Sequence, residues 1–209
     1  MTHLRSSGRV SATVLILIAA VGAGLGLWFG ARMLGAPPPL RTALLYPVPR
    51  VLAEFHLTRS DNTPLTMANW KGHWTVAFFG YTNCPDVCPT TLATFKQVWK
   101  QLDPASAEKL RFDFVSVDPA RDTPEQLARY VGYFSPDFIA ATGSDEELTA
   151  LTHSLGLVYS RNKTDNGDYT VDHSASAVII DPQGRQVGMF RPPFEAAKIA
   201  ADLTALAAK

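Results

Sequence analysis

Residues 75–92 read TVAFFGYTNCPDVCPTTL, and this stretch decides the fold. Residues 75–82 form a continuous apolar and aromatic run, which is typical of a buried central strand. Residues 89–102 carry apolar side chains at the spacing of one helical face, with a proline suited to the first turn. The only cysteines of the chain, Cys84 and Cys88, therefore fall where a central strand gives way to a helix.

The same alternation of strand and helix continues toward the C-terminus. A hairpin is expected before the cysteine segment, with strands at 53–58 and from 65 onward, and a strand at 112–117 is expected after it. Two capping boxes then predict helices, one from Thr123 and Gln126 to about 133 and one from Ser144 and Glu147 to Gly156. A polar loop at 161–173, strands at 176–181 and 186–190 and a helix from 194 complete the expected order. Helices between central strands, with a hairpin near the end, predict an α/β sandwich of the thioredoxin type.

The N-terminal region predicts a membrane anchor. Residues 10–31 contain no charged side chain and are bounded by Arg9 and Arg32. About 20 apolar residues span a bilayer core of ~30 Å, whereas a cleaved signal peptide has an apolar region of only ~7–15 residues. We therefore expect an uncleaved, single-pass transmembrane helix at 10–31. Arginines flank both ends of this helix, so the positive-inside rule does not decide its orientation. The simplest topology, with a short cytoplasmic tail at 1–9, is therefore the expected one.

The segment after the anchor is rich in proline. Residues 32–51 predict an extended, semi-rigid linker that holds a soluble domain at 52–209 away from the membrane. The apolar fraction of 46% is that of an ordinary packed protein. Lys plus Arg and Asp plus Glu each number 19, so no net charge draws the chain to nucleic acid or to an acidic partner.

The position of the cysteines favours thiolate chemistry, because free backbone N–H groups and the helix dipole stabilise negative charge at a helix start. Residues four apart on a helix have Cβ atoms ~5–6 Å apart, whereas a disulfide needs ~3.5–4.5 Å. Closing Cys84 to Cys88 would require an irregular first turn, which Pro85 and Pro89 would provide. The C-x-x-x-C spacing favours a metal site more than C-x-x-C does. A structural disulfide, a redox couple and half of a metal site all remain open.

One of the five histidines stands out as a third ligand. His3 lies in the predicted tail, His56 and His73 lie near polar turns, and His153 lies in a predicted helix. His173 instead precedes a central strand, in a loop that faces the cysteine loop in a thioredoxin-type sheet. A neutral imidazole beside two thiolates suits Cu(I) and tolerates Cu(II).

Three motifs together carry a resemblance to a known family. Residues 80–92 (GYTNCPDVCPTTL), 116–124 (SVDPARDTP) and 172–185 (DHSASAVIIDPQGR) resemble the Sco/SenC family of membrane-anchored copper chaperones. The resemblance extends from about residue 52 to the C-terminus, and the order and spacing of the three motifs are highly specific.

The resemblance implies a thioredoxin-like fold in which Cys84, Cys88 and His173 carry copper as Cu(I), Cu(II) or both. It implies a role in assembling the binuclear copper centre of cytochrome c oxidase. The partners would be the copper-bearing subunit of the oxidase and other periplasmic copper carriers. With a short N-terminal tail and no transit peptide, the expected location is the bacterial inner membrane, with the soluble domain in the periplasm.

Acidic residues in these motifs have less specific expected roles. Asp86 and Asp172 flank the predicted site and are candidates for hydrogen-bonding a ligand. Asp118, Arg121 and Asp122 are interpreted as a turn before the capped helix.

Other functions of the same thiols stay in view. The first is a dedicated thiol-disulfide reductase that acts on cysteines of the oxidase subunit through a redox-active Cys84–Cys88 pair. A general oxidoreductase is disfavoured, because no proline occurs between Pro136 and Pro182 and His173 takes the place of the usual one. The proline-threonine-cysteine arrangement of a peroxidase is absent. A copper or redox sensor would need an output partner, which no sequence feature reveals. A structural disulfide would explain neither the position of the cysteines at the start of a helix nor the position of His173.

Overall fold

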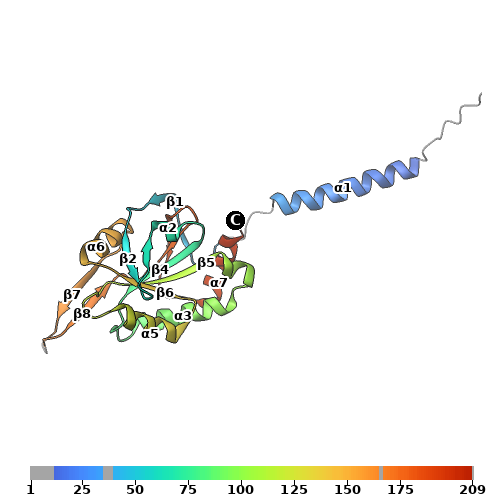
Figure 1. The fold of residues 1–209 in the computed structure, drawn as a ribbon. Helices are drawn as coiled ribbons and strands as arrows, with labels where there is room; N and C mark the ends of the chain where they lie inside the picture. The colour runs from blue at the N-terminus through green and yellow to red at the C-terminus, as the bar shows by residue number, and fades with distance from the viewer. Residues whose placement is uncertain (1–11, 35–39, 165–166, 209) are drawn as a thin grey trace, which may run out of the picture. The chain divides into compact units, whose positions relative to one another are not determined.

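The computed structural model describes residues 12–34, 40–164 and 167–208 (Figure 1). The chain divides into two units, with the boundary after residue 39. In the first unit, residues 12–34 form the helix α1 (Ala12–Leu34). Its stretch Ala12–Gly30 is long and apolar enough to cross a bilayer, which confirms the predicted apolar helix as a candidate span. The predicted tail at 1–9 lies outside the described residues.

The second unit contains an eight-stranded sheet in the order β1-β10-β9-β4-β5-β6-β2-β3. The strands β4, β5 and β6 pair in parallel, and the other pairs are antiparallel. The strands are β1 (Leu44–Val51), β2 (His56–Arg59), β3 (Pro64–Thr66), β4 (Trp74–Gly80), β5 (Leu110–Ser116), β6 (Ile139–Thr142), β9 (Ala177–Ile180) and β10 (Arg185–Phe190). The helices are α2 (Met67–Trp70), α3 (Val87–Gln101), α4 (Pro104–Glu108), α5 (Pro124–Phe134), α6 (Asp145–Ser154) and α7 (Ala196–Ala207). This arrangement confirms the predicted α/β sandwich.

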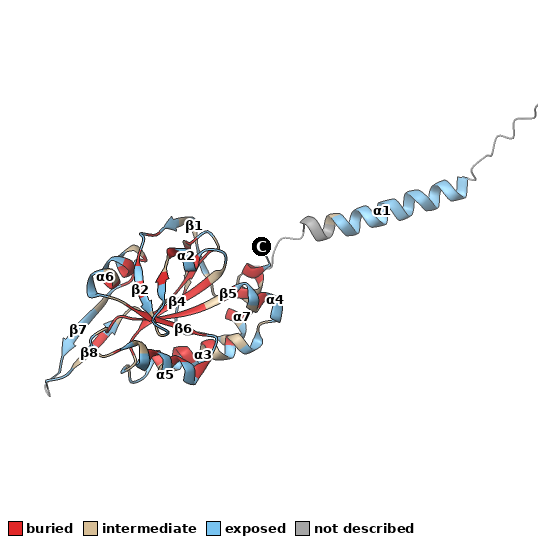
Figure 2. Cartoon of the chain, in the orientation of Figure 1, coloured by how far each residue is buried: buried red, intermediate tan, exposed pale blue. Residues whose placement is uncertain are grey.

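The central strands are buried on both faces, as Figure 2 shows by the red colour along β4 and β5. On one face Phe112 of β5 stacks on Phe95 of α3 with ring centroids 4.6 Å apart, and Phe114 contacts Tyr130 of α5. On the other face Trp70 of α2 donates its indole N–H to a carboxylate of β5. Burial on both sides explains why residues 75–82 read as one continuous apolar run.

The predicted linker is wrong in its second half, because residues 44–51 form the edge strand β1. Prolines hide this strand in the sequence, since a proline cannot donate a ladder hydrogen bond. An edge strand tolerates them at a break in pairing. Pro47 and Pro49 fall inside a register shift between Leu45 and Arg50.

A buried carboxylate fixes the residues just before β1. Asp202 of α7 is 1% exposed and accepts the backbone N–H groups of Arg41, Thr42 and Ala43 at 2.6–2.8 Å. The folded unit therefore begins at Leu40, twelve residues before the predicted boundary at 52.

The predicted polar loop at 161–173 is also wrong. It forms most of a two-stranded antiparallel sheet, β7 (Tyr159–Lys163) and β8 (Tyr169–His173). Figure 1 shows this hairpin, in orange, extending from the body of the domain. His173 is the last residue of β8, so a strand rather than a loop presents it.

The two predicted capping boxes differ in outcome. The box at Thr123 and Gln126 forms both of its hydrogen bonds. At the start of α6, Ser144 accepts the N–H of Glu147, but the Glu147 carboxylate accepts the backbone N–H of His56 at 3.0 Å. Within the described residues, therefore, half of the second box forms, and its glutamate joins α6 to β2.

Candidate metal centre

The cysteine segment begins where β4 ends. Cys84 lies in the loop, where its N–H donates to the carbonyl oxygen of Tyr81 at 3.3 Å, and Cys88 is the second residue of α3. The N–H of Cys88 points back to Sγ of Cys84 at 3.4 Å. Both thiols are free, with Cys88 buried and Cys84 half-buried. Because Cys84 precedes the helix, the irregular geometry expected between the two residues is present.

A glycine makes room for the buried thiol. A Cβ atom added to Gly80 would lie 2.5 Å from Sγ of Cys88 and 3.1 Å from the ring of Phe114. Any side chain at this position must displace the sulfur or the ring. The last residue of β4 thus sets the depth at which Cys88 sits.

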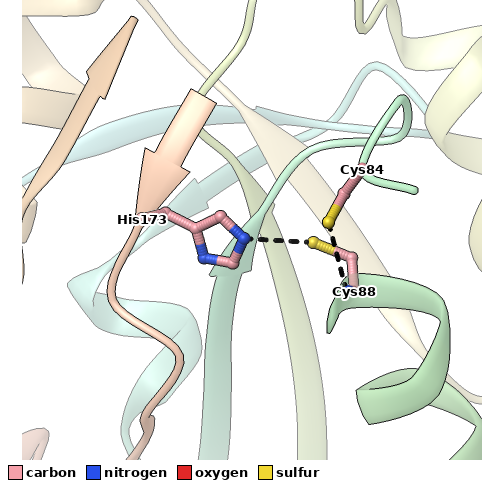
Figure 3. A group of neighbouring side chains, drawn as sticks. All are labelled: Cys84, Cys88 and His173. Carbon is pink, nitrogen blue, oxygen red and sulfur yellow. Dashed lines mark hydrogen bonds between the residues drawn. The ribbon is translucent and has the colours of Figure 1, made fainter. Parts of the chain in front are cut away.

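His173 reaches the cysteines from the opposite side, and Figure 3 shows its ring pointing at them from β8. Its Nε2 lies 3.4 Å from Sγ of Cys88, and its Nδ1 lies 3.2 Å from the carbonyl oxygen of Ser174. A carbonyl can only accept, so Nδ1 carries the proton and the lone pair of Nε2 faces the sulfur. This is the tautomer that a metal ligand needs.

Two aromatic rings surround the imidazole. The rings of Phe78 and Tyr81 meet it edge-on, with centroids 5.8 and 6.0 Å away. These contacts limit rotation of the ring. His173 is therefore held in position before any ion binds.

The structure brings all three sequence-predicted ligands together. The sulfur atoms of Cys84 and Cys88 and a ring nitrogen of His173 lie within 4.8 Å of one another. Donor atoms bound at ~2.0–2.3 Å around a three-coordinate ion lie about 4 Å apart. Two soft sulfurs and one imidazole at this separation fit a single soft transition-metal ion such as copper.

The two thiols share one proton unequally. The hydrogen bond from the Cys88 thiol lowers the pKa of Cys84 to about 3, and the backbone N–H groups of Cys88 and Asp86 act in the same direction against the effect of burial. The hydrogen bond to Cys84, together with burial, raises the pKa of Cys88. At neutral pH Cys84 is a thiolate and Cys88 a thiol, so a metal ion must displace the Cys88 proton.

The segment after β5 braces the hairpin that carries His173. The hydroxyl of Tyr169 and Nε of Arg121 donate to opposite oxygens of the buried Asp118, each at 2.5 Å. The guanidinium of Arg121 also lies 3.7 Å from the ring centroid of Tyr169. These contacts join β8 to the body of the domain four residues before His173.

The same segment braces the cysteine loop. Asp122 accepts the backbone N–H of Thr82 at 2.9 Å and its hydroxyl at 2.6 Å. The predicted turn is present, because Arg121 and Asp122 donate backbone N–H groups to the carbonyl oxygen of Asp118. Sequence reasoning missed the bracing role, because it depends on partners about 40 to 50 positions away.

Asp86 and Asp172 contact other groups. The Asp86 carboxylate accepts the hydroxyl of Thr90 at 3.2 Å, and that of Asp172 accepts the amide of Asn162 at 2.7 Å. Among the described residues, neither carboxylate is hydrogen-bonded to a sulfur or to the imidazole. The backbone carbonyl of Ser174 orients His173 instead.

A cavity of about 460 Å³ opens beside the three ligands. Cys84, Asp86 and Val87 line one side of it, and Asp172 and His173 line the other. An ion or a partner's side chain therefore has a path to Cys84. The fold and the site together define a class: thioredoxin-like proteins with a cluster of two cysteines and one histidine suited to a soft metal.

The family follows from comparison with known proteins. The SCO1/SenC family model matches residues 46–208, so this chain belongs to the SCO1/SenC family. A protein of Stutzerimonas stutzeri, described by name as a candidate copper-binding protein, is 38% identical over 152 residues, which are 73% of this chain and 74% of its own length. The chain spans less of two mitochondrial relatives, 39% and 66% of their lengths.

Solved structures agree with this assignment. The structure of Bradyrhizobium japonicum ScoI with copper bound is 35% identical, with a TM-score of 0.67 over 75% of this chain and 99% of that one. The apo Sco1 protein from Thermus thermophilus is 34% identical, with a TM-score of 0.72 over 78% of this chain and 95% of that one. The sequence-based identification of the family is confirmed.

Proposed function

We propose that this chain is a membrane-anchored copper metallochaperone, which binds copper through Cys84, Cys88 and His173 and assists assembly of the binuclear copper centre of cytochrome c oxidase. One observation carries the proposal: the lone pair of His173 Nε2 faces Sγ of Cys88 at 3.4 Å, with Nδ1 committed to a carbonyl. Membership of the SCO1/SenC family and the copper-bound relative support copper as the cargo.

Each of the three side chains has a different role in copper binding and release. Cys84 is half-buried and lines the open cavity, so its thiolate is the first group that incoming copper meets. Cys88 is buried and gives up its proton as it becomes the second ligand. His173 completes the set without a change of tautomer. The copper-bearing subunit of the oxidase would receive copper through the same cavity, and other periplasmic copper carriers would supply it.

The proposed location is the bacterial inner membrane, with a single span and the copper-binding domain in the periplasm. The apolar stretch Ala12–Gly30 supports a span. An alkaline phosphatase fused after Lys209 should be active, and the protein should stay in membranes after a high-salt wash, because apolar burial does not weaken with salt. An inactive fusion or release by salt would contradict this topology.

A dedicated thiol-disulfide reductase is the second candidate. The low pKa of Cys84, about 3, which the hydrogen bond from Cys88 maintains, keeps a thiolate available for attack on a disulfide. Such an enzyme would reduce the cysteines of the oxidase subunit before copper enters. Its redox couple needs Cys84 and Cys88 but not an imidazole.

The variant His173→Ala separates the two functions, because it removes a ligand and leaves both thiols. For a chaperone, cells with this variant at normal protein level and limiting copper should lack the copper centre of the oxidase. His153→Ala is the matched control, because His153 is an exposed histidine of α6. Full oxidase assembly in His173→Ala cells would overturn the chaperone function and favour the reductase.

A further inference from the structure

A second cavity, of about 300 Å³, lies at the other end of the two strands that lead to the metal centre. Thr75 near the start of β4 and Asp113 of β5 form its floor, on the face of the sheet that also contacts α2. The remaining polar lining includes Arg59, Lys71, His73 and Arg111. This volume is at the lower end of the range for small-molecule sites, ~300–1,000 Å³.

Buried polar atoms of this cavity lack partners. Arg59 Nε, His73 Nδ1, Thr75 Oγ1 and Asp113 Oδ1 are buried and have no hydrogen-bond partner among the residues that the structure describes. The residues Thr75 and Asp113 are 0% and 1% exposed. Buried groups of this kind are nearly always satisfied, so either a ligand or ordered water completes this site.

Three of the four atoms are hydrogen-bond donors. Arg111 Nη2 lies 3.1 Å from His73 Nε2, and because arginine can only donate, Nε2 accepts and Nδ1 carries the proton. The free atom of His73 is therefore an N–H group. Arg59 Nε is also an N–H donor, and the hydroxyl of Thr75 can donate. Because three hydrogen-bond donors in this cavity are unused, a matching ligand must carry acceptor atoms.

The charges of the lining favour a negative ligand. Arg59, Lys71 and Arg111 contribute three positive charges, against one carboxyl group. That carboxyl, Asp113, already accepts the indole N–H of Trp70 at 2.6 Å through Oδ2. Burial raises the pKa of Asp113 to about 6, so the group loses its charge in mildly acidic solution and can then donate as well.

We propose that this cavity binds a small oxyanion, a carboxylate or phosphate group, through Arg59, His73 and Thr75. The bound group would be within reach of Asp113, which must be neutral for the tightest binding. The site shares no residue with the metal centre, so the proposal does not depend on the copper function.

Calorimetric titration of the full chain in detergent tests the proposal, with inorganic phosphate and acetate as separate probes at pH 5.5 and pH 8. We expect saturable binding of one anion per chain, tighter at pH 5.5, where the Asp113 carboxyl is mostly neutral. Binding of phosphate alone assigns a phosphate group, and binding of acetate alone assigns a carboxylate. No saturable binding of either probe means that water alone fills the cavity, and it overturns the proposal.

Two variants and a control make the test specific. Thr75→Val removes one donor at nearly constant shape and should weaken binding by about tenfold or more. Asp113→Asn removes the opposing charge and should tighten binding at pH 8, a gain that misfolding cannot produce. Thr91→Val changes a buried threonine of α3 outside this cavity and should leave binding unchanged. Equal affinities for Thr75→Val and Thr91→Val, or no gain for Asp113→Asn, would contradict the assignment.

Discussion

Buried polar groups have partners at one end of strands β4 and β5 and lack them toward the other end. Beyond Gly80, the thiols of Cys84 and Cys88 and the imidazole of His173 point at one another within 4.8 Å. Near the start of β4 and at the middle of β5, buried atoms of Thr75 and Asp113 have no partner among the described residues. At the first end the polar side chains contact one another without a ligand, and loss of the Cys88 proton turns them into a metal site. The second end needs something from outside the chain.

This difference teaches how burial acts on ionisation. At the metal centre, hydrogen bonds outweigh burial and lower the pKa of Cys84 to about 3. At the other end, burial outweighs the indole hydrogen bond and raises the pKa of Asp113 to about 6. The charge of Cys84 is therefore stabilised by hydrogen bonds that outweigh partial burial, whereas nearly complete burial opposes the charge of Asp113.

The largest expected effect concerns the thiolate of Cys84. With a pKa of about 3, its alkylation by iodoacetamide should be nearly constant from pH 5 to pH 8. Cys88→Ala removes the main hydrogen bond, so the pKa should rise toward the ordinary value of ~8.5 and the thiolate fraction at pH 6 should fall about 100-fold. Mass spectrometry of the labelled peptide measures both rates. A wild-type rate that climbs tenfold per pH unit up to pH 8 would contradict the proton sharing.

The second prediction contrasts two buried aspartates. The folded-state pKa of Asp113, about 6, exceeds its ordinary value of 3.8, so its contribution to stability is present below about pH 4 and is lost as pH rises through 6. Asp113→Asn should therefore raise the free energy of unfolding at pH 8 by about 1–3 kcal/mol relative to wild type. Asp202→Asn should lower it, because the Asp202 carboxylate accepts three backbone N–H groups.

Urea unfolding of both variants at pH 5 and pH 8 measures these changes. The gain for Asp113→Asn should shrink at pH 5, where the wild-type carboxyl is mostly protonated. If both substitutions change stability with the same sign at pH 8, the buried carboxylates of Asp113 and Asp202 do not differ as described.

The third prediction concerns the space beside Cys88. Gly80→Ala places a Cβ atom 2.5 Å from Sγ of Cys88, so the sulfur must move away from the other ligands. We expect copper affinity to fall about 10- to 100-fold, as for residues that position ligands. Gly132→Ala is the matched control, because apart from its chain neighbours and the backbone of its own helix no described heavy atom lies within 4 Å of the added carbon. Competition with a chromogenic copper chelator compares them, and equal affinities would show that Gly80 does not position Cys88.

Much of this molecule could be predicted from its sequence, because local signals and tertiary structure agree there. The apolar run at 75–82, the capping box at Thr123 and the isolated position of His173 each carry their own signal. The β7–β8 hairpin was missed because its residues are polar. Asn166-Gly167 in the sequence is a strong hairpin signal that could have revealed it.

Other features could not be predicted, because they depend on distant partners. The prolines of 44–51 argue against a strand until β10 is seen beside them. Asp202 carries no distinguishing signal in the sequence, although its carboxylate accepts backbone N–H groups about 160 positions earlier. The cavity at Asp113 likewise combines residues of β2, β4 and β5 with the segment after α2, and no single stretch of sequence carries its pattern.

The measurement that tests the central claim most directly is a Cu(II) titration of the reduced full chain and of His173→Ala, followed by visible absorption. The three-ligand site predicts one copper per chain in the wild type, with a thiolate-to-copper absorption band. In His173→Ala this band should be lost, while Cu(I), which two soft thiolates can still hold, should bind with a smaller loss of affinity. An unchanged absorption band and stoichiometry in His173→Ala would mean that the imidazole is not a ligand, and the metal centre described here would be wrong.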